Sequence, residues 1–317
     1  MTNANVGSGN SQPPVSKSSL GYIKGDLARL ELPPPKYENP SQLGSRLLLI
    51  WRVFLFVLLV LPSMAVQLVL MGIGSPKAKR FPRWFHKKLL KCIGIDVVKR
   101  GRPSKHGPTL FVCNHISYLD IPILGSLVDG SFVAKAEISR WPFFGWLAKM
   151  QYSLFIDREP KNAAKHAEAL KQRLEQSENL FLFPEGTTCS GVRVETFKSS
   201  LFSVAQIKPN GKPVLVQPVS IAYTHLDGMR MGRNFRFFFS WFGSQDLAPH
   251  LAEALMLGKL KVIVEFHPVV TIEEFGRRQA LAKHCFDQIS DSMAEAIVGR
   301  SQRNPIKPRA LETTEAV

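Results

Sequence analysis

Cysteine is scarce in this sequence. Its 317 residues include four cysteines, and no two of them form a Cys-x-x-Cys pair. This spacing excludes the common zinc-binding motifs and indicates no disulfide framework, so we expect no metal site and a reducing, cytoplasmic environment. The four are Cys92, Cys113, Cys189 and Cys285.

Acidic residues are also few. The chain has 25 Asp and Glu against 41 Lys and Arg, which gives a formal net charge of +16. Between Lys77 and Lys105, eleven basic residues are opposed by a single acidic residue, Asp96. Such a local excess predicts an anionic surface as a neighbour, which is either a nucleic acid or a membrane.

Charge is absent altogether from residues 53–73, which read VFLFVLLVLPSMAVQLVLMGI. A helix of that length is about 30 Å long, close to the thickness of the hydrocarbon core of a bilayer. A nucleic-acid-binding protein has no use for this segment. We therefore expect no nucleic-acid partner and a location at the inner membrane, with anionic headgroups against the basic residues on the cytoplasmic side. Pro62 and Gln67 leave open a single span, a re-entrant pair of helices or a helix buried in protein.

Composition divides the chain into four segments. Residues 1–45 are polar and rich in proline, and we expect them to be disordered. Residues 46–105 combine the apolar helix with a basic amphipathic stretch that suits a membrane interface. Residues 106–300 should form the folded domain that carries the chemistry, and residues 301–317 form a polar tail.

Short apolar runs alternate with helical patterns through the folded domain. Helices are expected at 162–177 and 276–299. The alternation predicts an α/β fold with a mixed, mostly parallel sheet flanked by helices, preceded by the N-terminal membrane-associated helical segment. The expected strands are 109–113, 131–134, 153–157, 180–183, 214–222, 235–241 and 261–266.

Three polar motifs each follow an expected strand: NHISYLD at 114–120, LFIDR at 154–158 and LFLFPEGT at 180–187. One open sheet brings strand ends together, so these motifs should share a pocket. His115 can accept a proton from a hydroxyl near neutral pH, and Asp120 would fix its tautomer if the chain turns between them. The alternative is a histidine that caps the sheet edge beside a carboxylate at a helix start.

No Gly-x-Ser-x-Gly nucleophile accompanies this pair, and Cys113 lies in an apolar run that we expect in the core. Arg158 follows the second expected strand, where a guanidinium suits a phosphate or a carboxylate. Its alternative is a surface arginine paired with Asp157 or Glu159.

The stretch FPEGTTCSG combines a carboxylate with a flexible turn. Gly186 allows the backbone to approach a ligand, and Thr187 adds a hydroxyl. Glu185 would accept a hydrogen bond from a substrate hydroxyl or orient Arg158. A plain turn explains the proline and the glycine but not the glutamate between them.

Four blocks in this order resemble the glycerolipid acyltransferase family, in particular the 1-acylglycerol-3-phosphate (lysophosphatidic acid) acyltransferases. The resemblance covers roughly residues 80–270. Each block alone is weakly specific, whereas the ordered set is strongly specific. The blocks are His115-x4-Asp120, FIDR at 155–158, FPEGT at 183–187 and VLVQPVSIAY at 214–223.

The resemblance implies that His115 is the general base and Asp120 its partner. It implies direct attack of a lysolipid hydroxyl on a thioester, so the partners would be the lysolipid acceptor and an acyl carrier protein or coenzyme A thioester, with no other cofactor. Residues near Pro218 would help to shape the site. The residues expected at the acceptor headgroup are Arg158, Glu185, Gly186, Thr187 and Lys198.

One position departs from the family pattern. Many members that recognise a phosphate carry arginine after the EGT, where this chain has Thr188, although Arg193 would offer a substitute. FPEGTT and SIAYTHLDGMRMGR resemble members that acylate lyso-ornithine lipid. The expected product is phosphatidic acid from 1-acylglycerol 3-phosphate. Acylation of lyso-ornithine lipid is the first alternative, and a thioesterase or a non-catalytic membrane lipid-binding module is a further one.

Overall fold

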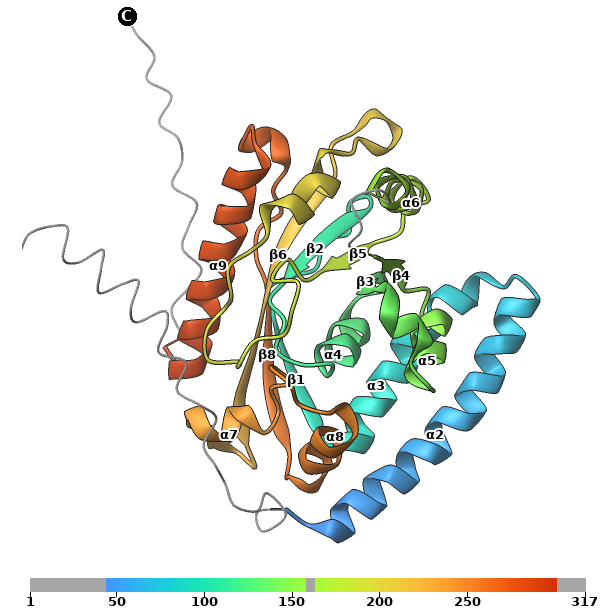
Figure 1. The fold of residues 1–317 in the computed structure, drawn as a ribbon, viewed down its shortest axis with the longest axis vertical. Coiled ribbons are helices and arrows are strands. Elements are labelled where there is room, and N and C mark those ends of the chain that lie inside the picture. Colours follow the sequence, from blue (N-terminus) through green and yellow to red (C-terminus); the bar gives the residue numbers. More distant parts are fainter. Residues whose placement is uncertain (1–43, 158–162, 301–317) are drawn as a thin grey trace, which may run out of the picture. The chain divides into compact units, whose positions relative to one another are not determined.

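The structure, a computed structural model, describes residues 44–157 and 163–300 (Figure 1). Arg158, nearly all of the expected 1–45 segment and the 301–317 tail lie outside the described residues.

An eight-stranded sheet forms the centre of the fold, in the order β1-β8-β6-β2-β5-β3-β4, with β7 paired to β6. Neighbouring strands run parallel except where β6 pairs with β8 and β7. The expected mixed, mostly parallel sheet is therefore confirmed. The strands are β1 (Ile95–Arg100), β2 (Thr109–Cys113), β3 (Ser131–Lys135), β4 (Leu154–Ile156), β5 (Leu180–Leu182), β6 (Leu215–Leu226), β7 (Met229–Arg230) and β8 (Leu260–Phe266).

Helices cover both faces of the sheet (Figure 1). Helix α9 packs against β6 on one face, whereas α3 and α4 pack against each other on the opposite side. The helices are α2 (Arg46–Gly72), α3 (Phe81–Ile93), α4 (Asp120–Leu127), α5 (Phe144–Met150), α6 (Ala163–Glu175), α7 (Arg233–Phe237), α8 (Leu247–Met256) and α9 (Arg278–Val298). Short 3-10 helices are η2 (Pro76–Lys79), η3 (Ala136–Arg140), η5 (Ser199–Gln206), η6 (Pro209–Gly211) and η7 (Ile272–Glu274).

The middle of the sheet is apolar because its strands are buried on both faces. All five residues of β2 are inaccessible to solvent. The ring of Phe181 stacks on those of Phe111 and Phe132, with centroids 5.2 and 4.6 Å apart, and this stack joins β2, β5 and β3. A rigid central sheet therefore fixes the position of any group placed at its edge.

Helix α2 has two unlike faces. It contacts α3 and α8, and Arg52 and Gln67 on that side are buried. The Arg52 guanidinium donates to the carbonyl oxygens of Leu255 and Gly258 at 3.0 and 2.9 Å, and to that of Leu257. Among the described residues, α2 is the one helix long and apolar enough to cross a membrane. The opposite face exposes Leu47, Ile50, Trp51, Phe54, Leu58 and Leu61.

The structure contains α5, α8 and β7, which were not expected, and it differs from the expected elements in two further places. Residues 235–241 do not form a strand, because the chain turns into α7 and Arg236 folds back to donate to the carbonyl oxygens of Met231 and Tyr223. A short apolar run such as Phe-Phe-Phe fits a buried strand and a buried helix equally. Strand β1 also joins the sheet, although it lies within the 46–105 segment expected at the membrane.

Candidate active site

His115 and Asp120 meet at the carboxyl end of β2. The imidazole Nδ1 lies 2.9 Å from Asp120 Oδ2. The chain turns between them because the same oxygen accepts the backbone N–H groups of Ile116 at 2.6 Å and Ser117 at 3.0 Å. Asp120 is fully buried, whereas 19% of the His115 side chain is exposed. Since Nδ1 faces Asp120, Nε2 is the nitrogen that would meet a substrate hydroxyl.

Asn114 places this turn at the end of the strand. Its side-chain Nδ2 donates to the carbonyl oxygen of Ile221 at 3.0 Å, and its Oδ1 accepts the N–H of Ile221 at 2.7 Å. The amide thus continues the pairing of β2 with β6 by one further residue. Our sequence reasoning missed this role, for which the only signal was a polar residue between an apolar run and His115.

Tyr223 is a second residue that sequence reasoning missed as part of the site. Its hydroxyl donates to Asp120 Oδ1 at 2.7 Å, and the side chain is fully buried. Burial and the negative charge of Asp120 raise the pKa of Tyr223 well above its ordinary value, so the hydroxyl keeps its proton. Tyr223 closes the block VLVQPVSIAY, but no pattern within that block shows where its side chain points.

Phe183 and Glu185 hold His115 from the side of β5. The Phe183 ring stacks on the imidazole with centroids 4.0 Å apart and planes at 16°. Glu185 is buried, and its two oxygens accept the N–H groups of His115 at 2.6 Å and Glu195 at 2.8 Å. Both oxygens therefore bind the protein's own backbone, whereas the sequence predicts a contact with the substrate. Burial raises the pKa of Glu185 to about 8, against the effect of these two donors.

Gly186 and Lys198 lie together beside this glutamate. Gly186 has a φ of 70°, and a Cβ added there would come within 2.8 Å of Lys198 Nζ. The Lys198 N–H also donates to the carbonyl oxygen of Pro184 at 2.9 Å. Thr187 and Lys198 are exposed. Glu185 thus contacts His115 directly, and Gly186, with Lys198 over it, and Thr187 follow in the same turn, while Arg158 lies outside the described residues.

Cys113 is in the core, as expected, and is not available as a nucleophile. It is fully buried, and burial together with the charge of Asp120 raises the pKa of its thiol well above the ordinary value. A buried, protonated thiol is unreactive as a nucleophile. Within the ranges 44–157 and 163–300, no three His, Cys, Asp or Glu side chains gather as a metal-binding group.

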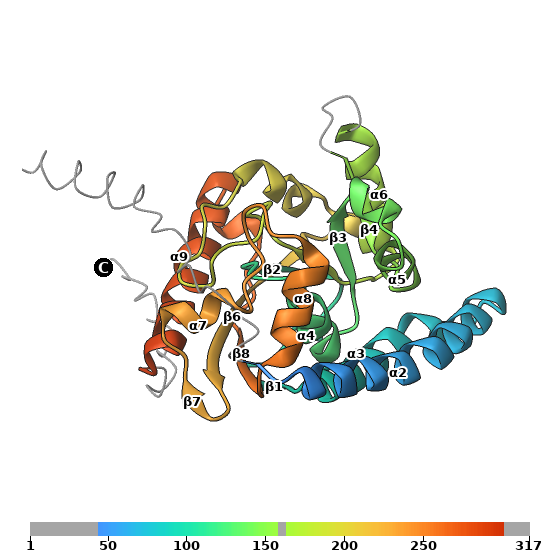
Figure 2. The same cartoon turned by 60° about the horizontal axis from the view of Figure 1, so that its bottom comes forward.

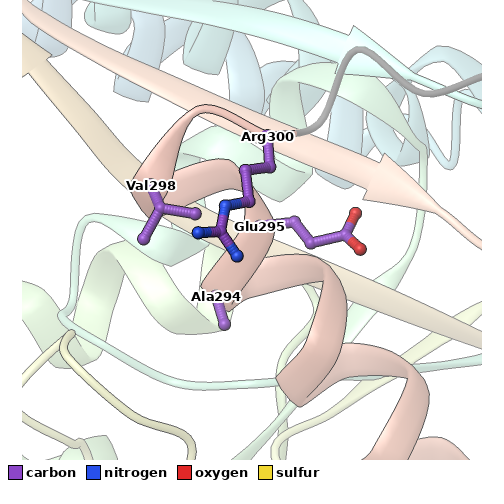
Figure 3. A pocket seen from close by; sticks show the side chains of 4 residues that line it. All are labelled: Ala294, Glu295, Val298 and Arg300. Atoms are coloured by element: carbon purple, nitrogen blue, oxygen red, sulfur yellow. The ribbon is translucent and has the colours of Figure 1, made fainter.

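A hollow of about 390 Å³ lies elsewhere, at the carboxyl end of α9 (Figure 3). Its lining consists of Ala294, Glu295, Val298 and Arg300. None of the predicted site residues contributes to it, and the carboxylate of Glu295 with the guanidinium of Arg300 does not form a catalytic arrangement. The candidate catalytic groups therefore lie away from this hollow, at the end of β2.

Fold and site together define an α/β protein with a histidine–aspartate pair at the carboxyl edge of its sheet. The Acyltransferase family model matches residues 90–222. The chain is 35% identical over 252 residues to the lyso-ornithine lipid O-acyltransferase of Rhizobium meliloti (strain 1021), which covers 78% of this chain and 86% of that protein. The chain belongs to the Acyltransferase family, as the motifs predict.

Two further relatives extend the comparison. The 1-acyl-sn-glycerol-3-phosphate acyltransferase of Neisseria gonorrhoeae is 30% identical over 208 residues, which are 65% of this chain and 75% of that protein. The crystal structure of the 1-acyl-sn-glycerophosphate acyltransferase PlsC from Thermotoga maritima superposes with a TM-score of 0.59 at 20% identity. That match covers 82% of this chain and 97% of the other, and it confirms the fold.

Proposed function

We propose that this protein transfers an acyl group from a thioester to the hydroxyl of a lysolipid, and that the acceptor is lyso-ornithine lipid. The observation that carries the chemistry is the His115 ring held by Asp120 at 2.9 Å, at the edge of a rigid sheet. The acceptor assignment draws on the Rhizobium meliloti relative, which matches over more of the chain than the Neisseria gonorrhoeae relative does.

In the proposed reaction His115 acts as a general base. Its Nε2 takes the proton of the acceptor hydroxyl while that oxygen attacks the thioester carbonyl carbon. The tetrahedral intermediate collapses, the carbon–sulfur bond breaks, and the leaving thiolate takes the proton back from the imidazolium. Asp120 stabilises the imidazolium that exists between these steps. The donor is an acyl carrier protein or a coenzyme A thioester, and no acyl-enzyme forms.

The charges beside the dyad fit an ornithine headgroup better than a phosphate. An ornithine headgroup carries one carboxylate that its own side-chain ammonium balances, whereas a phosphomonoester carries up to two negative charges with no counter-charge of its own. Lys198 supplies one ammonium over the Gly186 turn. Thr188 supplies no charge, and Arg193, the possible substitute, lies with its Nε 3.4 Å from Glu195 Oε1. One cation for one carboxylate is the simplest match within the described part of the loop.

The outer face of α2 supports a location at a membrane. Helix α2 packs beside α3 (Figure 2), whose own exposed residues include Trp84, Lys87, Lys88 and Lys91. Apolar and aromatic groups flanked by lysines are typical of a surface that enters an anionic interface. We therefore propose that the protein acts at the cytoplasmic face of the inner membrane.

The test is to incubate the purified protein with a labelled acyl thioester and each acceptor separately. We expect lyso-ornithine lipid to be acylated fastest. His115→Ala should lower the rate by about 10²- to 10⁴-fold with an unchanged circular dichroism spectrum. Faster acylation of 1-acylglycerol 3-phosphate would contradict the acceptor assignment alone. Release of free fatty acid without any acylated acceptor would instead identify a thioesterase. Near-normal transfer by His115→Ala would contradict the assignment of His115 as the general base.

A further inference from the structure

The carboxylate of Asp120 accepts hydrogen bonds from two separate parts of the chain. His115 Nδ1 and the N–H groups of Ile116 and Ser117 all bind Oδ2, and all three belong to the turn that Asp120 closes. Oδ1 instead accepts the hydroxyl of Tyr223, which lies 103 residues further along the chain on β6. The orientation of the carboxylate therefore depends on a strand outside the catalytic turn.

The chemistry of this contact has one direction. An ionised carboxylate can only accept, so the hydroxyl of Tyr223 must donate. Both groups are fully buried, and a buried carboxylate oxygen without a donor is strongly unfavourable. Replacing the hydroxyl by hydrogen would leave Oδ1 facing an aromatic ring. The carboxylate would then be free to rotate away from His115, and its negative charge would be shared with one donor fewer.

We propose that Tyr223 is a positioning residue for the acyl transfer proposed above. Its hydroxyl holds the plane of the Asp120 carboxylate so that Oδ2 stays directed at His115 Nδ1. It also draws off part of the negative charge that the imidazole meets. Tyr223 does not touch the substrate, and it acts through Asp120 on the position of the imidazole and on its affinity for a proton. The inference rests on His115 being the base, and a substrate-free measurement can test it separately.

The test compares Tyr223→Phe with wild type, because this change removes one oxygen atom and keeps the ring. We expect kcat to fall by about 10- to 100-fold, the loss of a hydrogen bond to a charged group, with both KM values within about 3-fold. Without the Tyr223 hydroxyl, the negative charge of Asp120 acts more strongly on the imidazole and favours its protonated form. The acid limb of the kcat/KM profile should therefore move to higher pH. A Tyr223→Phe enzyme with wild-type kcat and an unmoved acid limb would overturn the proposal.

Ser220→Ala is the matched control. Ser220 lies on the same strand, is buried, and has a hydroxyl that contacts Ser292 Oγ at 2.7 Å and His267 Nε2 at 3.2 Å, on the side facing α9. The Ser220→Ala variant therefore loses a buried hydroxyl from β6 without affecting Asp120. We expect unchanged kcat and pH dependence. Equal effects in the two variants would show that β6 is merely sensitive to lost hydroxyls, and would overturn the assignment to Tyr223.

A second measurement needs no substrate. Diethylpyrocarbonate modifies neutral imidazole, and peptide mass spectrometry reads the modification of His115 separately from the other seven histidines. In Tyr223→Phe, the midpoint of His115 reactivity should move to higher pH, and in Ser220→Ala it should stay. Glu185, Cys113 and Cys189 also surround Asp120, but they are present in every variant, so the difference isolates the hydroxyl. An unmoved midpoint overturns the inference even if no acceptor is turned over, whereas an inactive wild type contradicts only the proposed function.

Discussion

Two buried carboxylates bind backbone N–H groups on either side of the same histidine. Asp120 accepts from Ile116 and Ser117 while it orients the imidazole. Glu185 accepts from the N–H of His115 itself and from that of Glu195. The ring and the backbone of His115 are therefore restrained by different acids, of which one faces the chemistry and the other ties the turn to the loop that follows β5.

The raised pKa of Glu185 predicts a pH-dependent stability. Because burial raises it from 4.5 to about 8, the folded protein binds more protons than the unfolded chain between these values. The contribution of this group is then most favourable below pH 4.5 and is lost as the pH rises through 8. Glu185→Gln has no such titrating group, so it does not lose this contribution. From pH 5 to pH 9, its unfolding free energy should rise relative to that of wild type by on the order of 4 kcal/mol.

Chemical denaturation at pH 5, 7 and 9 measures this difference. Glu168→Gln is the control, because it removes an exposed carboxylate from α6 that is not among the groups acting on Glu185. Its difference from wild type should stay nearly constant with pH. A constant difference for Glu185→Gln as well would show that the carboxylate is ionised in the folded protein across this range.

Local sequence patterns indicated the candidate site residues, but not the residues that hold them in position. His115, Asp120 and Gly186 stand in short motifs whose chemistry could be inferred from neighbouring residues, whereas Lys198 was expected only from the family resemblance. The roles of Asn114 and Tyr223 exist only because β6 pairs with β2 in one register, which aligns Cys113 with Val219. Pairing between distant segments has no signature inside either segment, so these contacts had to come from the structure.

At the scale of elements, the position of Asp120 depends on how closely α4 approaches α3. Gly125 of α4 faces His86 of α3, and a Cβ added to the glycine would lie 2.2 Å from the imidazole Nδ1. His86 is buried, and burial lowers its pKa to about 4, so it stays neutral at physiological pH. An uncharged ring packed on a glycine allows this close crossing.

Gly125→Ala should therefore push α4 away from α3. We expect a loss of about 1–3 kcal/mol in unfolding free energy from overpacking, and a decrease in kcat because Asp120 begins the same helix. Gly72→Ala is the matched control, since no atom lies within 4 Å of its added Cβ. Its stability should be unchanged or slightly higher. Wild-type stability of Gly125→Ala would show that the two helices separate without cost.

The elements themselves were predicted with uneven success for a physical reason. Strands such as β2 and β5 are buried on both faces and read as continuous apolar runs. Strand β1 lies at the edge of the sheet, and Asp96 and Lys99 are exposed there. Its sequence, IDVVKR, therefore resembles the basic stretch before it more than a buried strand. The strand predicted at 235–241 was wrong for the opposite reason: the run is apolar like a buried strand, but a helical turn buries these residues instead.

At the scale of the whole molecule, α2 and α3 lie side by side (Figures 1 and 2), and α2 exposes apolar side chains while α3 exposes lysines. Replacing Phe54, Leu58 and Leu61 together by serine should weaken binding to anionic vesicles by at least about 100-fold at any salt concentration. Sedimentation with vesicles measures this. An unchanged affinity would mean that α2 faces another protein instead of lipid.

A second variant separates the two forces in vesicle binding. Replacing Lys87, Lys88 and Lys91 by glutamine should weaken vesicle binding at low salt and have little effect at high salt, because exposed charges are screened. The variant with serines on α2 should show the reverse, a deficit that persists at high salt. Equal salt dependence of the two variants would contradict this division.

The buried polar residues of α2 also bear on the order in which the protein is made. Arg52 finds its carbonyl partners 203 to 206 residues later in the chain, at the end of α8 and just beyond it, and Gln67 finds one of its own at Met150. During synthesis the helix therefore leaves the ribosome long before these carbonyls exist. Until then, the Arg52 guanidinium must find water or other polar groups, so we expect this end of the nascent helix to stay at an aqueous boundary.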